Sequence, residues 1–276
     1  MTFFKRYNLP VTLIVVVLGL ASLFPFLWMV RSALMSNLEI YQFPPHPLPG
    51  KWRWDNFSYA VTLLPFGRYL VNTLLITIPS VFGVLLTSTM AAYAFARLEF
   101  VGKKFWFALV VGSMLMPSAC TIIPIFVAWT ELGFNNTYVP LIFPAFLGGG
   151  AFNIFLCRQF LKTIPRDLDE AAFLDGAGHI TILTRVLLPL VKPVLISIGL
   201  FAFVLYWNDL LGPIIYISDN DKNTISQGLA NFRGGFGTDY RAIMAVCCMT
   251  VAPIVALYLA GQKYFVEGIV LSGLKS

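Results

Sequence analysis

The sequence predicts an all-α membrane protein with six transmembrane helices. Of its 276 residues, 58% are hydrophobic and only 12% are charged, whereas about 25% of the residues in a soluble domain carry a charge. The mean hydropathy of +0.78 agrees with this composition. A hydrocarbon core about 30 Å thick requires roughly 20 apolar residues per helix, so the chain has room for about six spans. The apolar runs are continuous rather than alternating, which excludes β-barrel strands.

The six predicted spans are apolar runs separated by polar or proline-containing segments. They lie near residues 9–30, 70–96, 105–129, 138–161, 193–217 and 242–266. The first follows Lys5 and Arg6 and therefore resembles a signal peptide. Its apolar run is longer than the roughly 7–15 residues of a signal peptide, and no clear Ala-x-Ala cleavage site follows it. We therefore expect it to remain as the first transmembrane helix of a single transmembrane domain over residues 1–276.

The second, third and fourth spans contain residues that interrupt helices. These are Pro79, Pro117, Pro124, Pro140, Pro144 and the triplet Gly148-Gly149-Gly150. An interior proline removes a backbone hydrogen bond and bends the helix, and in lipid such breaks persist only where protein or water satisfies the freed groups. Two interpretations follow: close helix packing through small residues, or a gated path through the bundle. The clustering of the breaks in adjacent spans favours the path.

The distribution of basic residues predicts that both termini face the cytoplasm. Basic side chains concentrate in the N-terminal tail and around the loops after the second and fourth spans (Lys5, Arg6, Arg97, Lys103, Lys104, Arg158, Lys162, Arg166, Arg185 and Lys192). Cytoplasmic loops carry an excess of Lys and Arg, so residues 162–192 form a cytoplasmic loop. The long loops over residues 35–69 and 218–241 then lie outside. The first of them is rich in Pro, Trp and Phe, residues that favour the membrane interface or partner surfaces.

The cytoplasmic loop contains a polar segment that burial in lipid does not explain. Asp167, Asp169 and Glu170 would occupy the first turn of a short helix, where the helix dipole favours acids, and Pro165 suits its first position. Leu168, Ala171, Ala172 and Asp175 fall on one face at helical spacing, and the paired alanines make that face flat. Gly176 would end the helix in a left-handed conformation. A second short helix would follow, with Ile180, Leu183 and Leu187 on one face, and Pro189 would stop it.

This segment resembles the EAA signature of ABC-importer permeases. The signature is Glu-Ala-Ala, three residues, Gly, nine residues, Ile, any residue, Leu-Pro. Matching residues here are Glu170, Ala171, Ala172, Gly176, Leu188 and Pro189, with Val186 in place of Ile. The segments over residues 151–160, 206–209 and 262–268 extend the resemblance to about the C-terminal two thirds of the chain. Together they are similar to carbohydrate-type, MalG-like permease subunits.

The resemblance implies a fold, a function and a set of partners. The fold would be the type I permease fold of ABC importers, with a cytoplasmic coupling helix. In that family the EAA loop seats in a cleft of an ATPase subunit, which implies that role here for Glu170, Ala171, Ala172, Asp175, Gly176 and Pro189. The chain would form half of a path for an oligosaccharide or related sugar in a bacterial inner membrane. The implied partners are a second permease subunit in a heterodimer, two ATPase subunits and an extracytoplasmic binding protein. That protein would contact Asn231, Gly234 and Gly235 in the outer loop.

Polar residues within the spans are the candidates for the substrate path. Asn153 follows the glycine triplet, and Tyr206, Trp207, Asn208 and Asp209 are consecutive in the fifth span. Polar side chains are costly in a membrane and are functional candidates, and amide, carboxylate and aromatic groups suit a sugar. The alternative is polar contact between helices, worth only about 0.6 kcal/mol on average. Both interpretations stand equally for Asn153 and Asn208, while Asp209 favours a paired structural role.

Several other functions find no support in the sequence. No G-x-x-x-x-G-K-[ST] phosphate loop occurs, so ATP and Mg²⁺ would bind the partner ATPase subunits and not this chain. Cys120, Cys157, Cys247 and Cys248 form no CxxC pair, the two histidines lack metal spacing, and no catalytic constellation indicates an enzyme. The formal net charge of +6 comes from residues at span ends rather than from a nucleic-acid-binding patch. An ion-coupled secondary carrier, or an ABC importer of a non-sugar solute such as glycerol phosphate, is the remaining alternative.

Overall fold

The computed structural model describes residues 9–117, 119–235 and 239–273, and no strand occurs among them. Five helical stretches in these ranges are long and apolar enough to cross a membrane. They are Pro10–Ala33, Phe66–Arg97, Val139–Thr163, His179–Trp207 and Tyr240–Lys263. The predicted all-α membrane fold is therefore confirmed. The chain groups into two compact units, which are described in turn.

Unit 1 comprises Met1–Phe66 and Gly228–Pro253. Its helices are α1 (Leu9–Ala33), α2 (Asn37–Tyr41), α3 (Asp55–Leu63), most of α13 (Ile225–Gly235) and the first part of α14 (Tyr240–Gly273). A capping box between Ser36 and Glu39 starts α2. The buried Asn56 side chain donates to the carbonyls of Ala33 and Met35 at 2.8 and 2.9 Å, and so joins α3 to the end of α1. The predicted outer loop over residues 35–69 thus contains α2 and α3, and a side-chain hydrogen-bond pair ties α3 to the end of α1.

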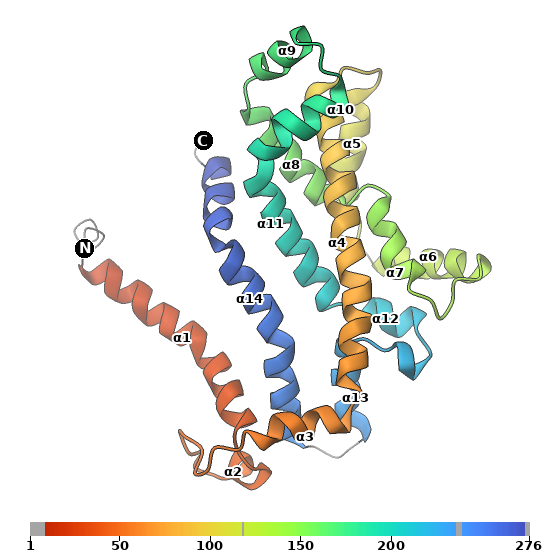
Figure 1. Cartoon of the computed structure of the whole chain (residues 1–276). Coiled ribbons are helices and arrows are strands. Elements are labelled where there is room, and N and C mark those ends of the chain that lie inside the picture. The colour runs from red at the N-terminus through yellow and green to blue at the C-terminus, as the bar shows by residue number, and fades with distance from the viewer. Residues whose placement is uncertain (1–8, 118, 236–238, 274–276) are drawn as a thin grey trace. The chain divides into compact units, whose positions relative to one another are not determined.

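Unit 2 comprises Gly67–Gln227 and Ile254–Ser276. It holds nearly all of α4 (Phe66–Arg97), then α5 (Lys103–Ser113), α6 (Ala119–Glu131), α7 (Val139–Ile142), η1 (Phe143–Phe146) and α8 (Ala151–Thr163). The chain continues through α9 (Asp167–Leu174), α10 (His179–Thr181), η2 (Ile182–Leu187), α11 (Leu188–Trp207), α12 (Leu211–Tyr216) and η3 (Asn220–Lys222). Its core lies where α4, α8, η2 and α11 meet, around Tyr93, Leu161, Ile182 and Val191 (Figure 1).

The predicted third span is not one helix. The stretch near residues 105–129 forms α5 and α6, of 11 and 13 residues, and Figure 1 shows them pointing in different directions. Between them the N–H groups of Met114, Leu115 and Met116 donate to carbonyls three residues earlier. Pro117 has no N–H and disfavours a helical conformation in the residue before it, which accounts for the break. A sixth crossing therefore stays a prediction.

The prolines of the other spans act differently from one another. Helix α4 passes through Pro79 without a break. Pro140 and Pro144 stand in the first turns of α7 and η1, where a missing N–H costs no helical hydrogen bond. The fourth span is interrupted at the glycine triplet, as predicted. There Gly149 has φ +68°, and an added Cβ would lie 2.6 Å from the Val84 carbonyl oxygen, so α4 and this turn approach too closely for a side chain.

The predicted fifth span begins earlier and ends earlier than expected. The prediction that Pro189 stops a short helix is wrong, because the helical stretch runs from His179 to Trp207. The π-helix η2 lies directly before α11, and Pro189 occupies the first turn of α11. In a π turn each N–H bonds to the carbonyl five residues earlier instead of four. Pro189 then stands in the first turn of α11, where its missing N–H costs no helical hydrogen bond. After Trp207 the chain leaves the helix and forms the separate helix α12.

Candidate functional site

The segment predicted to dock on another protein forms α9, at the end of unit 2 beyond α4 and α8 (Figure 1). Its first turn contains Asp167, Asp169 and Glu170, as predicted. The N–H groups of Asp169 and Glu170 both donate to the Arg166 carbonyl, at 2.8 and 3.1 Å. The helix therefore begins just after Arg166 rather than at Pro165, because Arg166 supplies the first accepting carbonyl.

The helix ends at Gly176, as the sequence predicts. Gly176 has φ +84°, and its N–H donates to the Phe173 carbonyl at 3.0 Å. The Ala177 N–H donates to the Ala172 carbonyl at 2.9 Å. These two bonds together with the left-handed residue form a Schellman motif, which satisfies carbonyls at the helix end and reverses the chain direction.

A buried ion pair attaches α9 to the end of α4. Arg97 Nε lies 2.7 Å from Asp169 Oδ2, and the two side chains are only 5% and 11% exposed. Arg97 also donates from Nη2 to the Ile164 carbonyl at 2.9 Å, which holds the chain that enters α9. Sequence reasoning counted Arg97 only as a positive charge at a span end. Nothing in the local sequence pairs it with Asp169.

A second link joins α4 to the residues after α9. The Tyr93 hydroxyl lies 3.0 Å from Nδ1 of His179, and the Phe173 ring meets the His179 ring edge to face, with centroids 5.0 Å apart. A small cavity of about 180 Å³ lies between the two links. Helix α9 and its return turn are thus attached to α4 at two places and form an anchored projection.

The outer face of this projection combines acids with exposed apolar side chains. Glu170, Ala171 and Asp175 are exposed, as is Leu168. Ala172, predicted on the same face, instead packs partly against the core of unit 2. Leu174 and Ile180 are 89% and 80% exposed, although Ile180 was expected on the same face as Leu183 and Leu187, which are partly and fully buried. The outer face of this projection therefore presents two acids beside two almost fully exposed apolar side chains.

Of the predicted path residues, Asn153 lines a pocket. Its side-chain amide donates to the Gly149 carbonyl at 2.7 Å. The pocket is open, holds about 800 Å³, and is also lined by Phe152, Phe201 and Leu205. The rings of Phe152 and Phe201 meet edge to face, with centroids 6.2 Å apart. An amide beside aromatic rings is chemically suited to a polar solute with apolar faces.

The four consecutive candidates at the end of α11, Tyr206 to Asp209, are not brought together at one surface. Trp207 is 1% exposed and stacks on Phe203 with ring centroids 5.2 Å apart, and Tyr206 packs against the core. Asn208 is exposed, and its side chain donates to the Val204 carbonyl at 2.9 Å. Asp209 accepts from the Gly212 N–H at 3.1 Å, a bond that joins the end of α11 to α12. In this conformation, therefore, only Asn208 of the four presents its side chain openly.

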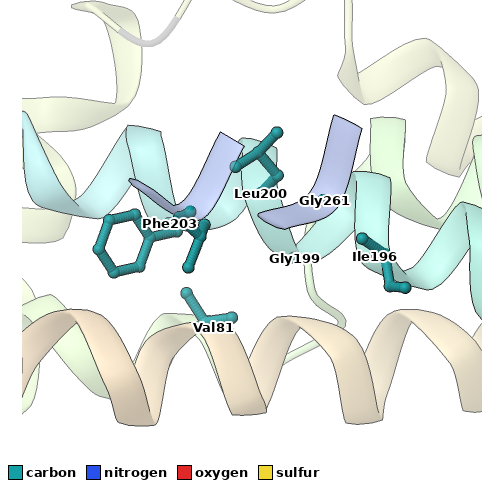
Figure 2. Close-up of a pocket in the computed structure, with 7 residues that line it drawn as sticks. Val81, Ile196, Gly199, Leu200, Phe203 and Gly261 are labelled. Atoms are coloured by element: carbon teal, nitrogen blue, oxygen red, sulfur yellow. The ribbon is translucent and has the colours of Figure 1, made fainter. Parts of the chain in front are cut away.

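A smaller pocket between α11, α4 and the second part of α14 is apolar (Figure 2). It holds about 220 Å³, and its described lining contains only apolar side chains and glycine. Gly199 and Gly261 lie in this contact, and added Cβ atoms would come within 3.6 Å of Leu85 and 3.5 Å of Ile196 respectively. These are ordinary contacts, and the apolar lining offers a polar solute no side-chain hydrogen-bond partner.

The three residues predicted to contact a binding protein lie in α13. Asn231 is exposed, and Gly234 and Gly235 end the helix. The predicted outer loop over residues 218–241 thus contains a helix, since α13 extends through both glycines. Residues 236–238 of the predicted loop lie outside the described residues. Within the described ranges, no group of three or more His, Cys, Asp or Glu side chains could hold a metal ion.

Comparison with known proteins places this geometry in a family. Residues 69–270 match the family described as "Binding-protein-dependent transport system inner membrane component". A probable ABC transporter permease protein of Bacillus subtilis, YurM, is 33% identical over 93% of this chain and 85% of its own. The diacetylchitobiose uptake permease NgcG of Streptomyces coelicolor is 31% identical over 87% and 80%. The trehalose/maltose permease MalG of Thermococcus litoralis is 31% identical over 94% of each chain.

A solved structure supports the same fold. It belongs to a bacterial ABC transporter involved in the import of the acidic polysaccharide alginate. The similarity has a TM-score of 0.83 and covers 96% of this chain and 100% of that chain, at 22% sequence identity. The family match covers well over half of the chain and includes α9, both of its links to α4 and the pocket beside Asn153. This chain belongs to the family of binding-protein-dependent transport system inner membrane components, the permease subunits of ABC transporters.

Proposed function

We propose that this chain is one of two permease subunits of an ATP-driven importer for an oligosaccharide or related sugar. Relatives named for diacetylchitobiose and for trehalose and maltose support the sugar. The family supports the general partnership with a binding protein, an ATPase and a second permease. The finer assignment is a heterodimer of permeases with two ATPase subunits, in a bacterial inner membrane, with both termini in the cytoplasm. In this assembly, ATP and Mg²⁺ would bind to the ATPase subunits.

The observation that carries the proposal is the anchored projection formed by α9. Its exposed acids and Leu174, whose side chain is 89% exposed, would supply a surface for a partner. Its buried Arg97–Asp169 pair connects that surface to α4, one of the five long apolar helices. A partner that moves α9 therefore moves α4 with it. Coupling of ATP hydrolysis to a membrane path requires such a mechanical connection, and Glu170, Ala171, Ala172, Asp175 and Gly176 would form its contact, followed by Pro189 at the start of α11.

Two substitutions on this surface, a charge reversal and a change of the helix end, test the coupling. In the purified complex of all subunits, Glu170→Lys or Gly176→Pro should abolish substrate-stimulated ATP hydrolysis and uptake while the chain still inserts in the membrane. Asp55→Lys is the matched control, because Asp55 is also an exposed acid in the first turn of a short helix. If both α9 variants retain wild-type assembly and substrate-stimulated ATP hydrolysis, the coupling assignment is wrong.

The path would run past Asn153 and Asn208. Asn153 combines an amide with the aromatic rings of its pocket, whereas Trp207 would serve to hold α11. Substitution of Asn153 by Ala should weaken uptake of the cognate sugar more than it lowers basal ATP hydrolysis. An equal loss of both activities would contradict a role in the path. The sugar itself can be identified by a thermal-shift screen of the cognate binding protein.

ATP dependence separates this proposal from an ion-coupled carrier. Asp209 is the acid that such a carrier would need near its path, but here it accepts a hydrogen bond from the Gly212 N–H. Proteoliposomes with the Asp209→Asn variant should keep ATP-dependent uptake. Uptake that needs a proton gradient and no ATP would refute the ABC importer assignment.

A further inference from the structure

A second pocket in unit 2 is lined by basic and aromatic side chains. It lies between the loop after α4, the start of α5 and α8, and holds about 710 Å³. Its lining is Glu99, Phe100, Gly102, Lys103, Lys104, Phe105, Phe107 and Arg158. Two of the long apolar stretches, Phe66–Arg97 and Val139–Thr163, end beside it. The pocket is therefore at the level where apolar spans give way to polar loops.

The electrostatics of this pocket favour an anion. Three basic side chains line it against the single carboxylate of Glu99. That carboxylate is already engaged, since it lies 3.0 Å from Lys103 Nζ and 3.8 Å from Arg166 Nη2. Lys162 adds a further positive charge within electrostatic range of Arg158 and Lys103. The excess of positive charge is concentrated on Lys104 and Arg158.

Arg158 is oriented for recognition of a phosphate. Its Nε donates to the Phe95 carbonyl at 3.1 Å, and its guanidinium carbon lies 3.8 Å from the centre of the Phe107 ring. These two contacts fix the plane of the guanidinium while it remains partly exposed. Among the described residues no carboxylate pairs with it and no hydrogen bond uses its Nη atoms. A fixed guanidinium with free Nη donors binds phosphate oxygens in pairs.

The walls of the pocket and its rim are apolar and exposed. Phe100, Val101, Phe105 and Trp106 are 40%, 96%, 61% and 54% exposed. A soluble phosphate would leave these side chains uncovered, whereas the glycerol backbone and acyl chains of a phospholipid would cover them. Aromatic side chains at this level are characteristic of the membrane interface, and basic pockets between spans bind anionic head groups.

We propose that the pocket formed by Lys103, Lys104, Arg158 and the surrounding Phe side chains binds the head group of an anionic phospholipid such as phosphatidylglycerol. Arg158 and Lys104 contact the phosphate, Lys103 adds positive charge while it remains paired with Glu99, and the aromatic rim packs on the upper acyl chains. Lipid bound there would join α5 to α8. This site is separate from the substrate path and from the α9 surface.

Native mass spectrometry of the purified complex tests the proposal. The complex is titrated with equimolar phosphatidylglycerol and phosphatidylcholine, and the bound lipids are counted. The wild type should retain phosphatidylglycerol preferentially. Lys104→Gln should weaken that binding about fivefold, and Lys104→Gln with Arg158→Gln roughly 25-fold, since each basic residue near an anionic surface contributes about a factor of five. Lys51→Gln, which removes an exposed lysine from unit 1, should leave the preference unchanged.

Two further arms separate the alternatives. Lys104 is exposed, and none of the described hydrogen bonds or ion pairs involves it, so the single variant reports on binding even if the loss of Arg158 disturbs folding. Arg158→Lys, which keeps the charge, should bind better than Arg158→Gln. The proposal is overturned if the Lys104→Gln variant keeps the wild-type lipid preference. It is equally overturned if millimolar inorganic phosphate displaces the lipid, because the site would then take a free anion.

Discussion

Removal of Arg97 should loosen the attachment of α9 to α4, leaving the Tyr93–His179 contact as the second link. In Arg97→Met, the Asp169 carboxylate loses its only ion-pair partner in the described structure, and the Ile164 carbonyl loses a donor at 2.9 Å. The two charged side chains are 5% and 11% exposed, so the value of 0–1 kcal/mol that applies to surface pairs is inappropriate. Breaking a buried pair from one side costs about 3–5 kcal/mol, because it leaves an uncompensated charge.

Hydrogen exchange measures this change locally. If α9 opens independently of the rest of unit 2, its amides should exchange roughly 100- to 4,000-fold faster in Arg97→Met, up to the limit of an unstructured peptide. Peptides from α11 should change much less. The double variant Arg97→Met/Asp169→Leu should recover most of the protection, since an apolar pair of similar size often replaces a buried ion pair without loss.

The matched control is an exposed ion pair in the same unit. Arg68 pairs with Asp221, and their side chains are 54% and 72% exposed. Arg68→Met should therefore cost less than about 1 kcal/mol and leave exchange near α4 and η3 within a few fold. Unchanged exchange in α9 of Arg97→Met, or equal effects of the two single variants, would refute the idea that burial makes the Arg97–Asp169 pair the main anchor.

Four other outcomes are expected. Gly176→Ala should destabilise the end of α9 by about 1 kcal/mol, because a side chain is strained at φ +84°; Gly178→Ala, at φ −79° with equally open space, should be neutral by the same hydrogen-exchange measurement. Gly149→Ala should lower the melting temperature of the complex more than Gly148→Ala. Both glycines have positive φ, but only at Gly149 would the added Cβ collide with Val84 and Ser88. Similar effects of the two variants would exclude the close approach of α4 to the turn at Gly149. Asn56→Ala should lower the stability of unit 1 by about 2–4 kcal/mol, since two buried carbonyls lose their donors. Ser58→Ala, which removes an exposed local hydrogen bond, should lower it by less than about 0.5 kcal/mol. Hydrogen exchange of the amides between α1 and α2 distinguishes the two variants. The hydrogen bond and charge of Lys103 lower the pKa of Glu99. The stabilisation from this pair is therefore fully present above the ordinary carboxyl pKa of about 4.3 and is lost as the pH falls through the lowered value. Lys103→Gln should raise the Glu99 pKa in an NMR titration, and an unchanged pKa would show that the pair does not form.

Local signals in the sequence predicted local structure well. The acids in the first turn of α9 and the glycine at its end were both recognisable, because helix dipoles and left-handed glycines act within a few residues. The glycine triplet also marked a true interruption before α8. The resemblance to the EAA signature followed from the spacing between Glu170 and Pro189, and the family match shows the family to which that resemblance pointed.

The contacts that fix the site could not be predicted in this way. Arg97 with Asp169, and Tyr93 with His179, join residues far apart in the chain. In a single sequence each of these residues can be interpreted only by itself, and Arg97, for example, is then only a positive charge at a span end. The exposure of Leu174 was likewise invisible, because an apolar residue in a helix is expected to be buried until the surrounding elements are known.

Proline was the least reliable guide. Pro79 lies in an uninterrupted helix, Pro117 accompanies a complete break, and Pro189 starts a helix that it was expected to end. The effect of each proline on its helix depends on whether the carbonyl that would have accepted the missing N–H finds another donor. At Pro189 the preceding π turn allows the chain to continue as a helix, and composition alone does not reveal such a turn.

The continuous helical stretch from His179 to Trp207 would act as a lever if it moved as one rigid body. With 29 residues and a rise of 1.5 Å per residue, it is about 43 Å long. A rigid tilt of about 10° at the His179 end would displace the Trp207 end by about 7 Å. Since His179 contacts both Phe173 of α9 and Tyr93 of α4, a small push on α9 would be magnified at Asn208, on the far side of the membrane-spanning region.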